Sequence, residues 1–370
     1  MVSDFKGYNI SQKLRNYADK MEEHNWIKVI LTPLSWLYGA VTSIRNLFYD
    51  QNIFHTEKPK QFTISIGNLT VGGTGKTPMT EYLVRLLSTI HKTAILSRGY
   101  GRKTKGFLLA NHASTAADIG DEPKQYFEKF GDQVSVAVCE KRVEGANQLS
   151  RLHPEISLIL LDDAFQHRAI GQNLKLLLND YNRPFYKDLP FPAGRLRETR
   201  NGAKRADAII VTKCPENISE AEKTKIIENI RRYSKPDVPV FFSFIRYAAP
   251  VGYSGEAVRL KNVKLVAGIA NPMTFVTHIR KQMNVIEEII FPDHHNYSSG
   301  DLEGLIKYLK NDTFVVTTEK DMVKLKPLVE ASGVAGKFAY IPVQVSFGSD
   351  TGRFHEWIFN QTGHLFQAER

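Results

Sequence analysis

Residues 67–78 read Gly-Asn-Leu-Thr-Val-Gly-Gly-Thr-Gly-Lys-Thr-Pro, and they follow the apolar, β-branched run Phe62–Ile66. This order predicts a strand, a glycine-rich loop and the start of a helix, the context in which a P-loop binds phosphate. Backbone N–H groups and the helix N-terminus would face phosphate oxygens, Lys76 would reach the β- and γ-phosphates, and Thr77 would ligate Mg²⁺. We therefore assign ATP binding to Gly72, Gly73, Thr74, Gly75, Lys76 and Thr77.

One position departs from the strict motif. The motif has glycine six residues before the lysine, and Thr70 stands there. Gly67 and Gly72 could provide the missing backbone freedom. A glycine-rich turn without a ligand is the alternative, but the strand–loop–helix context favours phosphate binding.

Short apolar runs alternate with helical segments from about residue 60 onward, as a parallel sheet with crossover helices requires. The runs are nearly continuous, which is typical of strands covered on both faces. We predict strands at Phe62–Ile66, Thr93–Ser97, Val134–Val138, Ser157–Leu161, Leu174–Leu178 and Ala208–Thr212. The pattern predicts an α/β fold of the P-loop NTPase type, a mostly parallel sheet with helices on both faces. Its ligand should lie beyond the carboxyl ends of the strands.

Two carboxylates follow the run Ser157–Leu161. An apolar run followed by aspartate is often only a strand that meets a turn. Beside a P-loop, however, a carboxylate at a neighbouring strand end suits the Mg²⁺ of a nucleotide. If the strand continues, adjacent residues point to opposite faces, so one of Asp162 and Asp163 could hold the metal or its water while the other faces the acceptor. We assign Asp162 to the metal with Thr77, and Asp163 to catalysis, while the choice between the two carboxylates as metal ligand stays open.

Asp121 and His294 each have a functional and a plain structural interpretation. Asp121 lies in Gly-Asp-Glu-Pro at 120–123 and could be the base for a hydroxyl acceptor, or it could cap a helix whose first turn contains Pro123. His294 belongs to a pair of histidines in a turn, where such residues are commonly solvated. The residues alone do not decide between these interpretations.

A chain of 370 residues is too long for one ordinary core. The composition changes near Lys235-Pro236-Asp237, and Val238–Tyr247 is an extended pattern. We predict an N-terminal helical segment at 1–50, a P-loop domain at 51–237, linker strands at 238–254 and a smaller α/β domain at 255–370. In the last, we expect strands Leu265–Ile269 and Phe314–Thr317 and helices after Asn271, Ser298 and Thr318, with capping pairs Ser298/Asp301 and Thr318/Asp321.

The charge balance indicates an anionic partner. Lys and Arg number 49 against 39 Asp and Glu, a formal charge of +10, which favours nucleic acid, anionic lipid or phosphorylated substrates. The two cysteines, Cys139 and Cys214, are far apart, which argues against a disulfide framework or a structural zinc site. A reducing compartment fits this composition.

The N-terminal segment carries an apolar stripe. Its members recur at helical spacing: Trp26, Ile30, Leu34, Leu37, Val41, Ile44 and Phe48. The longest apolar run, Val29–Val41, is shorter than the roughly 18–20 residues that cross a bilayer, and the acidic segment before it argues against an export signal. We expect a helix that lies in an anionic membrane interface, and packing on the protein's own core is the alternative.

Several blocks together resemble the tetraacyldisaccharide 4′-kinases of lipid A biosynthesis. Besides residues 67–78 these are Ser-Arg-Gly-Tyr-Gly-Arg at 97–102, Gly-Asp-Glu-Pro at 120–123, Leu-Asp-Asp-Ala-Phe-Gln-His-Arg at 161–168, Pro-Ala-Gly-Arg-Leu-Arg-Glu at 192–198 and Asp-His at 293–294. They cover almost the whole chain in the same order. Ala164, where glycine is common, and the residues up to Phe191 depart from the pattern without touching a phosphate-binding residue.

The resemblance implies a kinase that uses ATP and Mg²⁺ to phosphorylate the 4′-hydroxyl of an acylated glucosamine disaccharide 1-phosphate. It would act as a peripheral protein at the cytoplasmic face of the inner membrane of a Gram-negative bacterium. Asp121 would be the base, or a base partner of His294, and Arg197 and Glu198 would be further active-site residues. We expect a monomer that binds no nucleic acid.

Two alternatives come from other classes. A deviant-Walker ATPase switch of the partitioning type uses a signature lysine where this chain has Val71, which argues against that class. A nucleotide-binding membrane scaffold without turnover is the other alternative, and it predicts that Lys76→Ala would leave lipid A unchanged.

Overall fold

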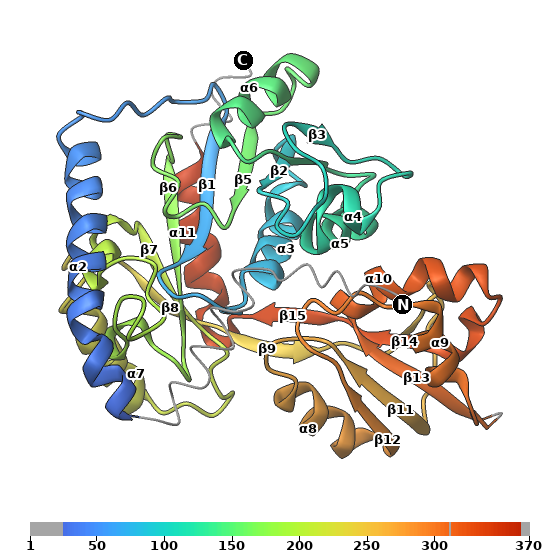
Figure 1. Cartoon of the computed structure of the whole chain (residues 1–370). Coiled ribbons are helices and arrows are strands. Elements are labelled where there is room, and N and C mark those ends of the chain that lie inside the picture. The colour runs from blue at the N-terminus through green and yellow to red at the C-terminus, as the bar shows by residue number, and fades with distance from the viewer. Residues whose placement is uncertain (1–24, 311, 364–370) are drawn as a thin grey trace, which may run out of the picture.

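The structure is a computed structural model that describes residues 25–310 and 312–363. An eight-stranded sheet and a five-stranded sheet are joined by a two-stranded ribbon that runs between them (Figure 1). Residues 1–24 of the predicted N-terminal segment, and residues 364–370 of the predicted smaller domain, lie outside the described residues.

The larger sheet has the strand order β3-β4-β2-β5-β1-β6-β7-β8. All neighbours pair in parallel except β3 and β4, which are antiparallel. The strands are β1 (Phe62–Asn68), β2 (Thr93–Ser97), β3 (Leu108–Leu109), β4 (Ser135–Val138), β5 (Leu158–Asp162), β6 (Leu174–Asp180), β7 (Ala208–Thr212) and β8 (Val240–Phe242). The predicted P-loop fold and its six strands are thus confirmed, with shifts of one or two residues at several ends.

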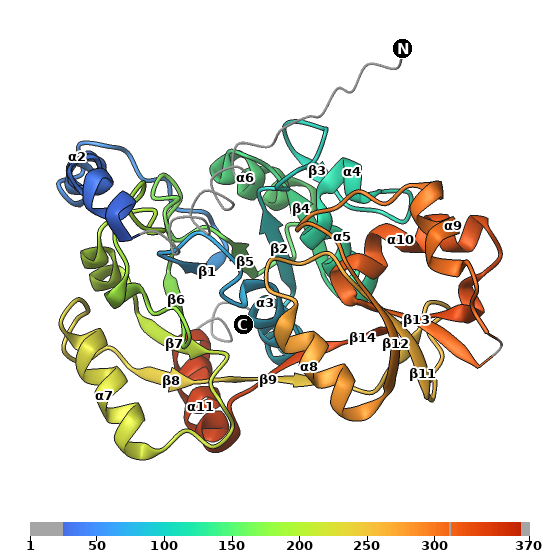
Figure 2. The same ribbon diagram turned by 60° about the horizontal axis from the view of Figure 1, so that its bottom comes forward.

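Helices cover both faces of this sheet (Figure 2). One face, which includes Ile64 and Ile66 of β1, packs against α3 (Lys76–Leu87), α5 (Asp121–Phe130) and α11 (Thr351–Thr362). The other face packs against α6 (Arg142–Leu152) near β2 and β5, and against α7 (Glu220–Arg231) near β7. Shorter helical pieces are α4 (Ala116–Ile119) and the 3₁₀ turns Phe185–Lys187 and Arg200–Arg205. Strands buried on both faces explain the unbroken apolar runs in the sequence.

The smaller sheet has the order β10-β14-β13-β11-β12. Its strands are β10 (Val251–Gly252), β11 (Asn262–Ala267), β12 (Asn284–Ile290), β13 (Thr313–Thr318) and β14 (Phe338–Ile341). Its helices are α8 (Met273–Gln282), α9 (Ser299–Ile306) and α10 (Glu319–Ala331), with a 3₁₀ turn at Ala335–Lys337. Ser298 and Thr318 cap α9 and α10 as predicted, each accepting a hydrogen bond from the backbone N–H three residues on.

The ribbon and the last helix change how the smaller unit is bounded. β9 (Phe244–Tyr247) pairs antiparallel with β15 (Val343–Ser346), and a 3₁₀ turn at Gly348–Asp350 then leads into α11. Phe354 and Ile358 of α11 belong to the core of the larger sheet. The predicted boundaries stay a prediction, and this packing leads us to propose that the smaller unit spans 251–341 while the chain after it returns to the P-loop unit.

Strand β11 ends earlier than predicted. The expected strand Leu265–Ile269 stops at Ala267, because the N–H of Gly268 donates to Oδ2 of Asp321 at 2.9 Å instead of to a neighbouring strand. β12 was not predicted: it is an edge strand whose residues are mostly exposed, so its sequence lacks the apolar run that marks the others.

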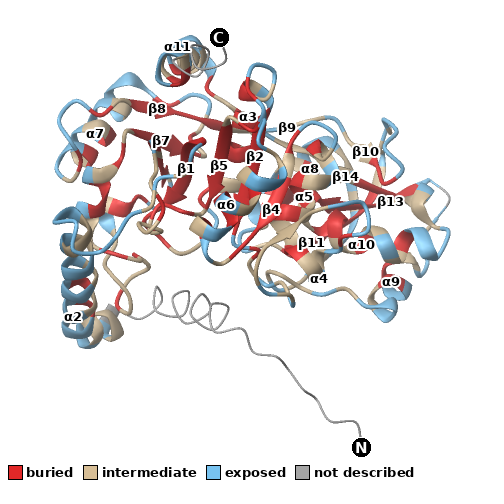
Figure 3. Cartoon of the chain, turned by 90° about the horizontal axis from the view of Figure 1, so that it is seen from above, coloured by how far each residue is buried: buried red, intermediate tan, exposed pale blue. Residues whose placement is uncertain are grey.

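Helix α2 (Asn25–Asp50) stands at the side of the larger sheet, and most of its surface is exposed (Figure 3). Six of the seven stripe residues face outward, each more than half exposed: Trp26, Ile30, Leu34, Leu37, Val41 and Ile44. The seventh, Phe48, is half-buried and packs edge-on against Phe54, with ring centroids 5.3 Å apart. The alternative in which the stripe packs on the protein's own core is therefore wrong. The helix residues Trp26–Asp50 are also long and apolar enough to cross a membrane by length and composition alone, which corrects the expectation drawn from the shorter run Val29–Val41.

Candidate active site

The P-loop connects β1 to α3. Gly75 precedes the first helical residue, Lys76, and has a φ of 85°, while Gly72 has a φ of 123°. A side chain at either position would be strained, because both angles lie in the region that favours glycine. A Cβ added to Gly72 or Gly73 would meet nothing within 4 Å, so the loop backbone is open on that side. This leaves room for a phosphate chain beside the helix N-terminus.

Polar contacts hold the loop from behind. Asn68 Nδ2 donates to Thr74 Oγ1 at 2.8 Å inside the protein, and Thr212 Oγ1 donates to the carbonyl oxygen of Thr74 at 2.9 Å. Lys213 Nζ donates to the carbonyl oxygen of Gly73 and, at 2.7 Å, to Asp180 Oδ2. The contacts of Thr212 and Lys213 direct the carbonyl oxygens of Thr74 and Gly73 away from the loop interior, while the N–H of Thr74 itself donates to the carbonyl oxygen of Gly72 at 3.1 Å.

Thr70 can occupy the motif position that normally holds glycine, because the backbone is extended there. It forms a β-bridge with Leu196, and the N–H of the next residue, Val71, donates to the carbonyl oxygen of Arg195 at 2.8 Å. An extended residue needs no glycine. The departure from the strict motif therefore leaves the positive-φ positions, Gly72 and Gly75, intact.

Asp163 lies between two cations. Lys76 Nζ is 3.6 Å and Arg197 Nη1 is 2.8 Å from the same oxygen, Oδ1. Burial alone would raise the pKa of Asp163, but the charges of Arg197 and Lys76 outweigh it, and the pKa lies well below its usual range. Burial lowers the pKa of Lys76, against the attraction of Asp163. The Asp163 carboxylate thus contacts Lys76, the residue that the sequence predicts to bind the β- and γ-phosphates.

Asp162 lies at the end of β5, opposite Ile66 of β1. Its Oδ2 accepts a hydrogen bond of 3.1 Å from Ser97 Oγ, at the end of β2. Burial, together with the charge of Asp163, raises the pKa of Asp162 to about 6. Asp162 is thus buried and Asp163 partly open, but Asp163 lies beyond the end of β5 with a φ of 48°, so strand alternation does not set the direction of its side chain.

Asp121 and His294 meet across the two units. His294 Nδ1 is 3.0 Å from Asp121 Oδ2. Gly120 occupies the N-cap of α5 with no side-chain cap, so the interpretation of Asp121 as the helix cap is wrong. His294 is mostly buried and has a φ of 61°, so it is not a solvated turn residue. The pair therefore has the geometry of a carboxylate–imidazole dyad.

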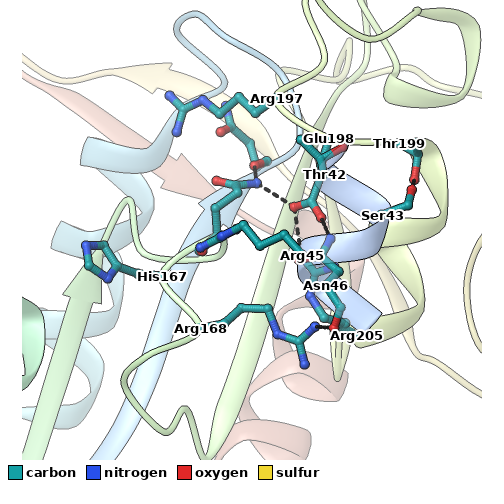
Figure 4. Close-up of polar contacts among 12 residues, drawn as sticks. Thr42, Ser43, Arg45, Asn46, His167, Arg168, Arg197, Glu198, Thr199 and Arg205 are labelled. Carbon is teal, nitrogen blue, oxygen red and sulfur yellow. Dashed lines mark hydrogen bonds and ion pairs between the residues drawn. The ribbon is translucent and has the colours of Figure 1, made fainter. Parts of the chain in front are cut away.

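Arg197 and Glu198 point to different neighbours (Figure 4). Arg197 reaches Asp163, whereas Glu198 accepts from Asn46 of α2 at 2.7 Å and from Arg205 at 2.7 Å. Gln166 Nε2 donates to Glu198 Oε1 at 2.9 Å and to the carbonyl oxygen of Asn68 at 2.8 Å. Glu198 is thus linked to β1, the strand before the P-loop, without touching the loop itself.

Comparison with known proteins identifies the family. The family model described as tetraacyldisaccharide-1-P 4′-kinase matches residues 27–362. The chain belongs to this family. Relatives named tetraacyldisaccharide 4′-kinase from Cytophaga hutchinsonii and Flavobacterium psychrophilum are 42% and 41% identical, over 88% and 91% of this chain and 93% and 97% of their own lengths. A crystal structure described as an "apo" form of LpxK from Aquifex aeolicus in complex with ATP superimposes with a TM-score of 0.74 at 27% identity, covering 90% of this chain and 99% of that one.

The kinase family accounts for the blocks that the sequence singled out, and neither the ATPase switch nor the scaffold is favoured. Sequence reasoning missed several residues of the site. Lys213 behind the P-loop follows an ordinary apolar strand, and buried Arg142 holds the carbonyl oxygens of Cys139 and Asp162 at 2.7 and 3.1 Å. Lys320 and Lys324 lie beside the Asp121–His294 pair but are distant from it in sequence. Their local sequences contain no phosphate-binding or metal-binding motif, so only the fold brings them to the site.

The donor set suits a magnesium ion bound to a nucleotide. Thr77 and Asp162 offer hard oxygen ligands; Thr77 lies in the first turn of α3 and Asp162 at the end of β5, a strand that α3 contacts. Among the described residues, no cluster of three or more His, Cys, Asp or Glu forms a complete metal cage.

Proposed function

We propose that this chain transfers the γ-phosphoryl group of ATP to the 4′-hydroxyl of tetraacyldisaccharide 1-phosphate, a step of lipid A biosynthesis. The observation that carries the proposal is the match of the family across residues 27–362, which includes the P-loop, both aspartates and the dyad. The open glycine loop, with Lys76 at the start of α3, supports ATP as the donor.

The P-loop residues Gly72 to Thr77 would bind the phosphate chain. Lys76 would then exchange part of its contact with Asp163 for the γ-phosphate, and Arg197 would keep Asp163 ionised during that exchange. Thr77 and Asp162 would hold Mg²⁺, which neutralises charge that develops on the phosphates when it is bound. Glu198 would act indirectly, by positioning the end of β1 through Gln166.

Asp121 would accept the proton of the acceptor hydroxyl, with His294 as its partner. In this step a bond forms between the 4′-oxygen and the γ-phosphorus, the bond from that phosphorus to the bridging oxygen breaks, and ADP leaves. Burial alone would raise the pKa of Asp121, but the hydrogen bond from His294 and the charges of Lys324 and Lys320 lower it below its usual value. Asp121 is therefore ionised at neutral pH and available as an acceptor.

The outward apolar face of α2 supports peripheral attachment to the cytoplasmic face of the inner membrane. One face of α2 is already occupied by polar contacts with the protein: Ser35 Oγ accepts from the N–H of Ala193 at 2.7 Å, and Arg45 donates to the carbonyl oxygen of Gln166 at 3.1 Å. A helix that crossed the bilayer would take these groups out of reach of their partners. An in-plane position keeps them and lets the stripe enter the lipid, where the acyl chains of the substrate lie. We further propose that the protein works as a monomer and binds no nucleic acid.

Replacement of the chromosomal copy by Lys76→Ala tests this function in cells. The proposal expects lipid A precursors that lack the 4′-phosphate to accumulate, as seen by mass spectrometry of extracted lipid. Wild-type lipid composition in cells that carry the variant would count against the proposal and for a scaffold without turnover.

A further inference from the structure

Helix α10 of the smaller unit lies beside α5 of the P-loop unit (Figure 2). Lys320 and Lys324 are four residues apart on α10, so they share one helical face, and that face meets the start of α5. There they approach Asp121 and Glu122. The Asp121–His294 pair is thus bordered by two cations whose role neither the motifs nor the family match assigns.

Lys320 contacts the far side of the imidazole. Its Nζ is 3.1 Å from His294 Nε2 and 3.2 Å from Asp293 Oδ1, with Glu122 Oε1 at 3.7 Å. Burial alone would lower the pKa of Lys320, but the negative charges of Glu122, Asp293 and Asp121 raise it above its usual value. Lys320 therefore stays an ammonium group, which donates hydrogen bonds and accepts none.

This contact determines which nitrogen of His294 carries the proton. Because Lys320 donates, Nε2 must accept, so the proton of the neutral ring is on Nδ1 and points to Asp121 Oδ2 at 3.0 Å. Without Lys320, a neutral imidazole could equally protonate Nε2, and Nδ1 would then present a lone pair to a carboxylate. The ring of Tyr100, 5.7 Å away, limits how far the imidazole can turn.

Lys324 approaches the carboxylate itself. Its Nζ is 3.4 Å from Asp121 Oδ2, its side chain is only 6% exposed, and the ammonium lies 5.8 Å from the ring of Tyr297. Within residues 25–310 and 312–363, this buried amine makes no hydrogen bond. A buried charge without a hydrogen bond is costly, so its position beside Asp121 calls for a functional reason.

Both partners approach the same oxygen of Asp121. His294 Nδ1 and Lys324 Nζ face Oδ2, and no hydrogen bond to Oδ1 is found among the described residues. We propose that Lys320 and Lys324 are positioning residues of the kinase: Lys320 fixes the tautomer of His294, and Lys324 keeps Asp121 ionised, which leaves Asp121 Oδ1 to take the proton of the acceptor hydroxyl. This inference rests on the proposed function.

The position of these lysines has a consequence for control of the reaction. Asp121 belongs to the P-loop unit, whereas His294, Lys320 and Lys324 belong to the smaller unit. The proton acceptor is therefore fully assembled only when α10 lies on α5. The contact between α10 and α5 therefore holds the proton acceptor and its partners together.

Substitution of the two lysines tests the proposal in the full chain. Lys320→Met and Lys324→Met should each lower kcat by about 10- to 100-fold, less than removal of a general base itself, and leave the KM for ATP within about two-fold. Lys320→Arg and Lys324→Arg should recover part of the loss. Lys326→Met is the matched control, because Lys326 pairs with Glu128 across the same helix contact at 3.2 Å but does not reach the dyad. It should retain wild-type kcat.

The pH profile separates positioning from folding. Lys324→Met removes a charge that lowers the pKa of Asp121, so the acidic limb of kcat should move to higher pH. His294, Lys320, Glu122 and Asp293 remain around Asp121 and set the rest of the profile. An unshifted limb in Lys324→Met, or losses of kcat that match losses of thermal stability and ATP affinity in all variants, would overturn the proposal.

Nitrogen NMR gives a test that does not depend on turnover. In ¹⁵N-histidine-labelled protein, with His294 assigned by its loss in His294→Gln, the wild type should show the Nδ1–H tautomer and Lys320→Met a mixture or the opposite tautomer. An Nε2–H ring in the wild type would contradict the inference even if the kinase is active. Absence of kinase activity in the wild type, with the expected tautomer, would instead count against the proposed function alone.

Discussion

The hydroxyl of Tyr38, on helix α2, donates a hydrogen bond of 2.9 Å to the backbone carbonyl of Arg197. The side chain of Arg197 in turn pairs with Asp163 at 2.8 Å, and Asp163 contacts the P-loop lysine, Lys76. Three successive contacts thus join the helix that carries the apolar surface to the P-loop lysine. Helix α2, for which we propose membrane attachment, is linked to the active site through the segment at 193–199.

Tyr38→Phe should weaken this link with little change in packing. Loss of one partly buried hydrogen bond costs about 1 kcal/mol. We expect kcat to fall by about two- to five-fold, because the backbone of Arg197 loses the hydrogen bond that holds it in place. The Kd for ATP should be unchanged. Kinase assays and calorimetry measure the two effects. Tyr308→Phe, at an exposed position of the smaller unit, is the control and should behave as wild type. A normal kcat in Tyr38→Phe would show that the hydrogen bond from Tyr38 to Arg197 is not needed for catalysis.

The exposed stripe should control binding to lipid. Leu37→Glu places a charge where a 63% exposed leucine would enter the bilayer, so partition onto vesicles of anionic phospholipid should fall by about 10-fold or more. The KM for lipid should rise while the affinity for ATP is kept. Leu152→Glu is the matched control, since Leu152 is 55% exposed on α6 and distant in sequence from the stripe. Equal sedimentation of both variants with vesicles would contradict the membrane role of α2.

Deletion of residues 1–50 should also reduce binding to vesicles, but it removes the contacts of α2 with Ala193 and Glu198 as well. The point substitution therefore separates lipid binding from these contacts, and the deletion does not.

Much of the larger sheet could be predicted from the sequence, because its strands are buried on both faces and read as unbroken apolar runs. Thr93–Ser97 and Ala208–Thr212 match the predicted bounds. The edge strand β12 and the return of α11 to the first core were not predictable in this way. An edge strand lacks the buried pattern, and the sequence of α11 does not say which of two cores it covers.

Lys213 should matter for ATP affinity, although it touches only the back of the P-loop. Lys213→Met removes its hydrogen bonds to the carbonyl oxygen of Gly73 and to Asp180. Loop carbonyls could then turn toward the phosphates and repel them, so the KM for ATP should rise by about 10-fold with a smaller change in kcat. Steady-state kinetics measure both, and Lys235→Met, a surface lysine paired with Asp207, is the control. An unchanged KM for ATP would refute this role.

Asp162→Asn should separate stability from catalysis. The pKa of Asp162 is raised to about 6 in the fold, so its ionisation opposes folding, and the unfolding free energy falls as pH rises toward about 6. The variant should therefore melt about 2–4 °C higher than the wild type at pH 8, the shift that ~1 kcal/mol produces. This gain should vanish near pH 4. The same variant should lose its response to Mg²⁺ in ATP binding. A lower melting temperature at pH 8 would contradict the assigned environment of Asp162.

The site was predictable where its residues stand in one motif and not where they meet through the fold. The residues 72–77 and the pair Asp162–Asp163 were found because strand ends carry them in sequence order. The contact between Asp121 and His294 joins residues 173 positions apart, so resemblance to a family suggested it and the fold showed it. Lys213, Lys320 and Lys324 have ordinary local sequence, and only their hydrogen-bond partners give them a role.

Transfer of label from [γ-³²P]ATP to purified tetraacyldisaccharide 1-phosphate tests the central claim most directly. With wild-type protein and Mg²⁺, we predict a radiolabelled lipid with its new phosphate at the 4′ position, and with Lys76→Ala we predict at least a 100-fold lower rate, on the order of the loss of ~3 kcal/mol of transition-state stabilisation. A wild-type protein that leaves the lipid unlabelled, or a Lys76→Ala protein that labels it at the wild-type rate, would contradict the account.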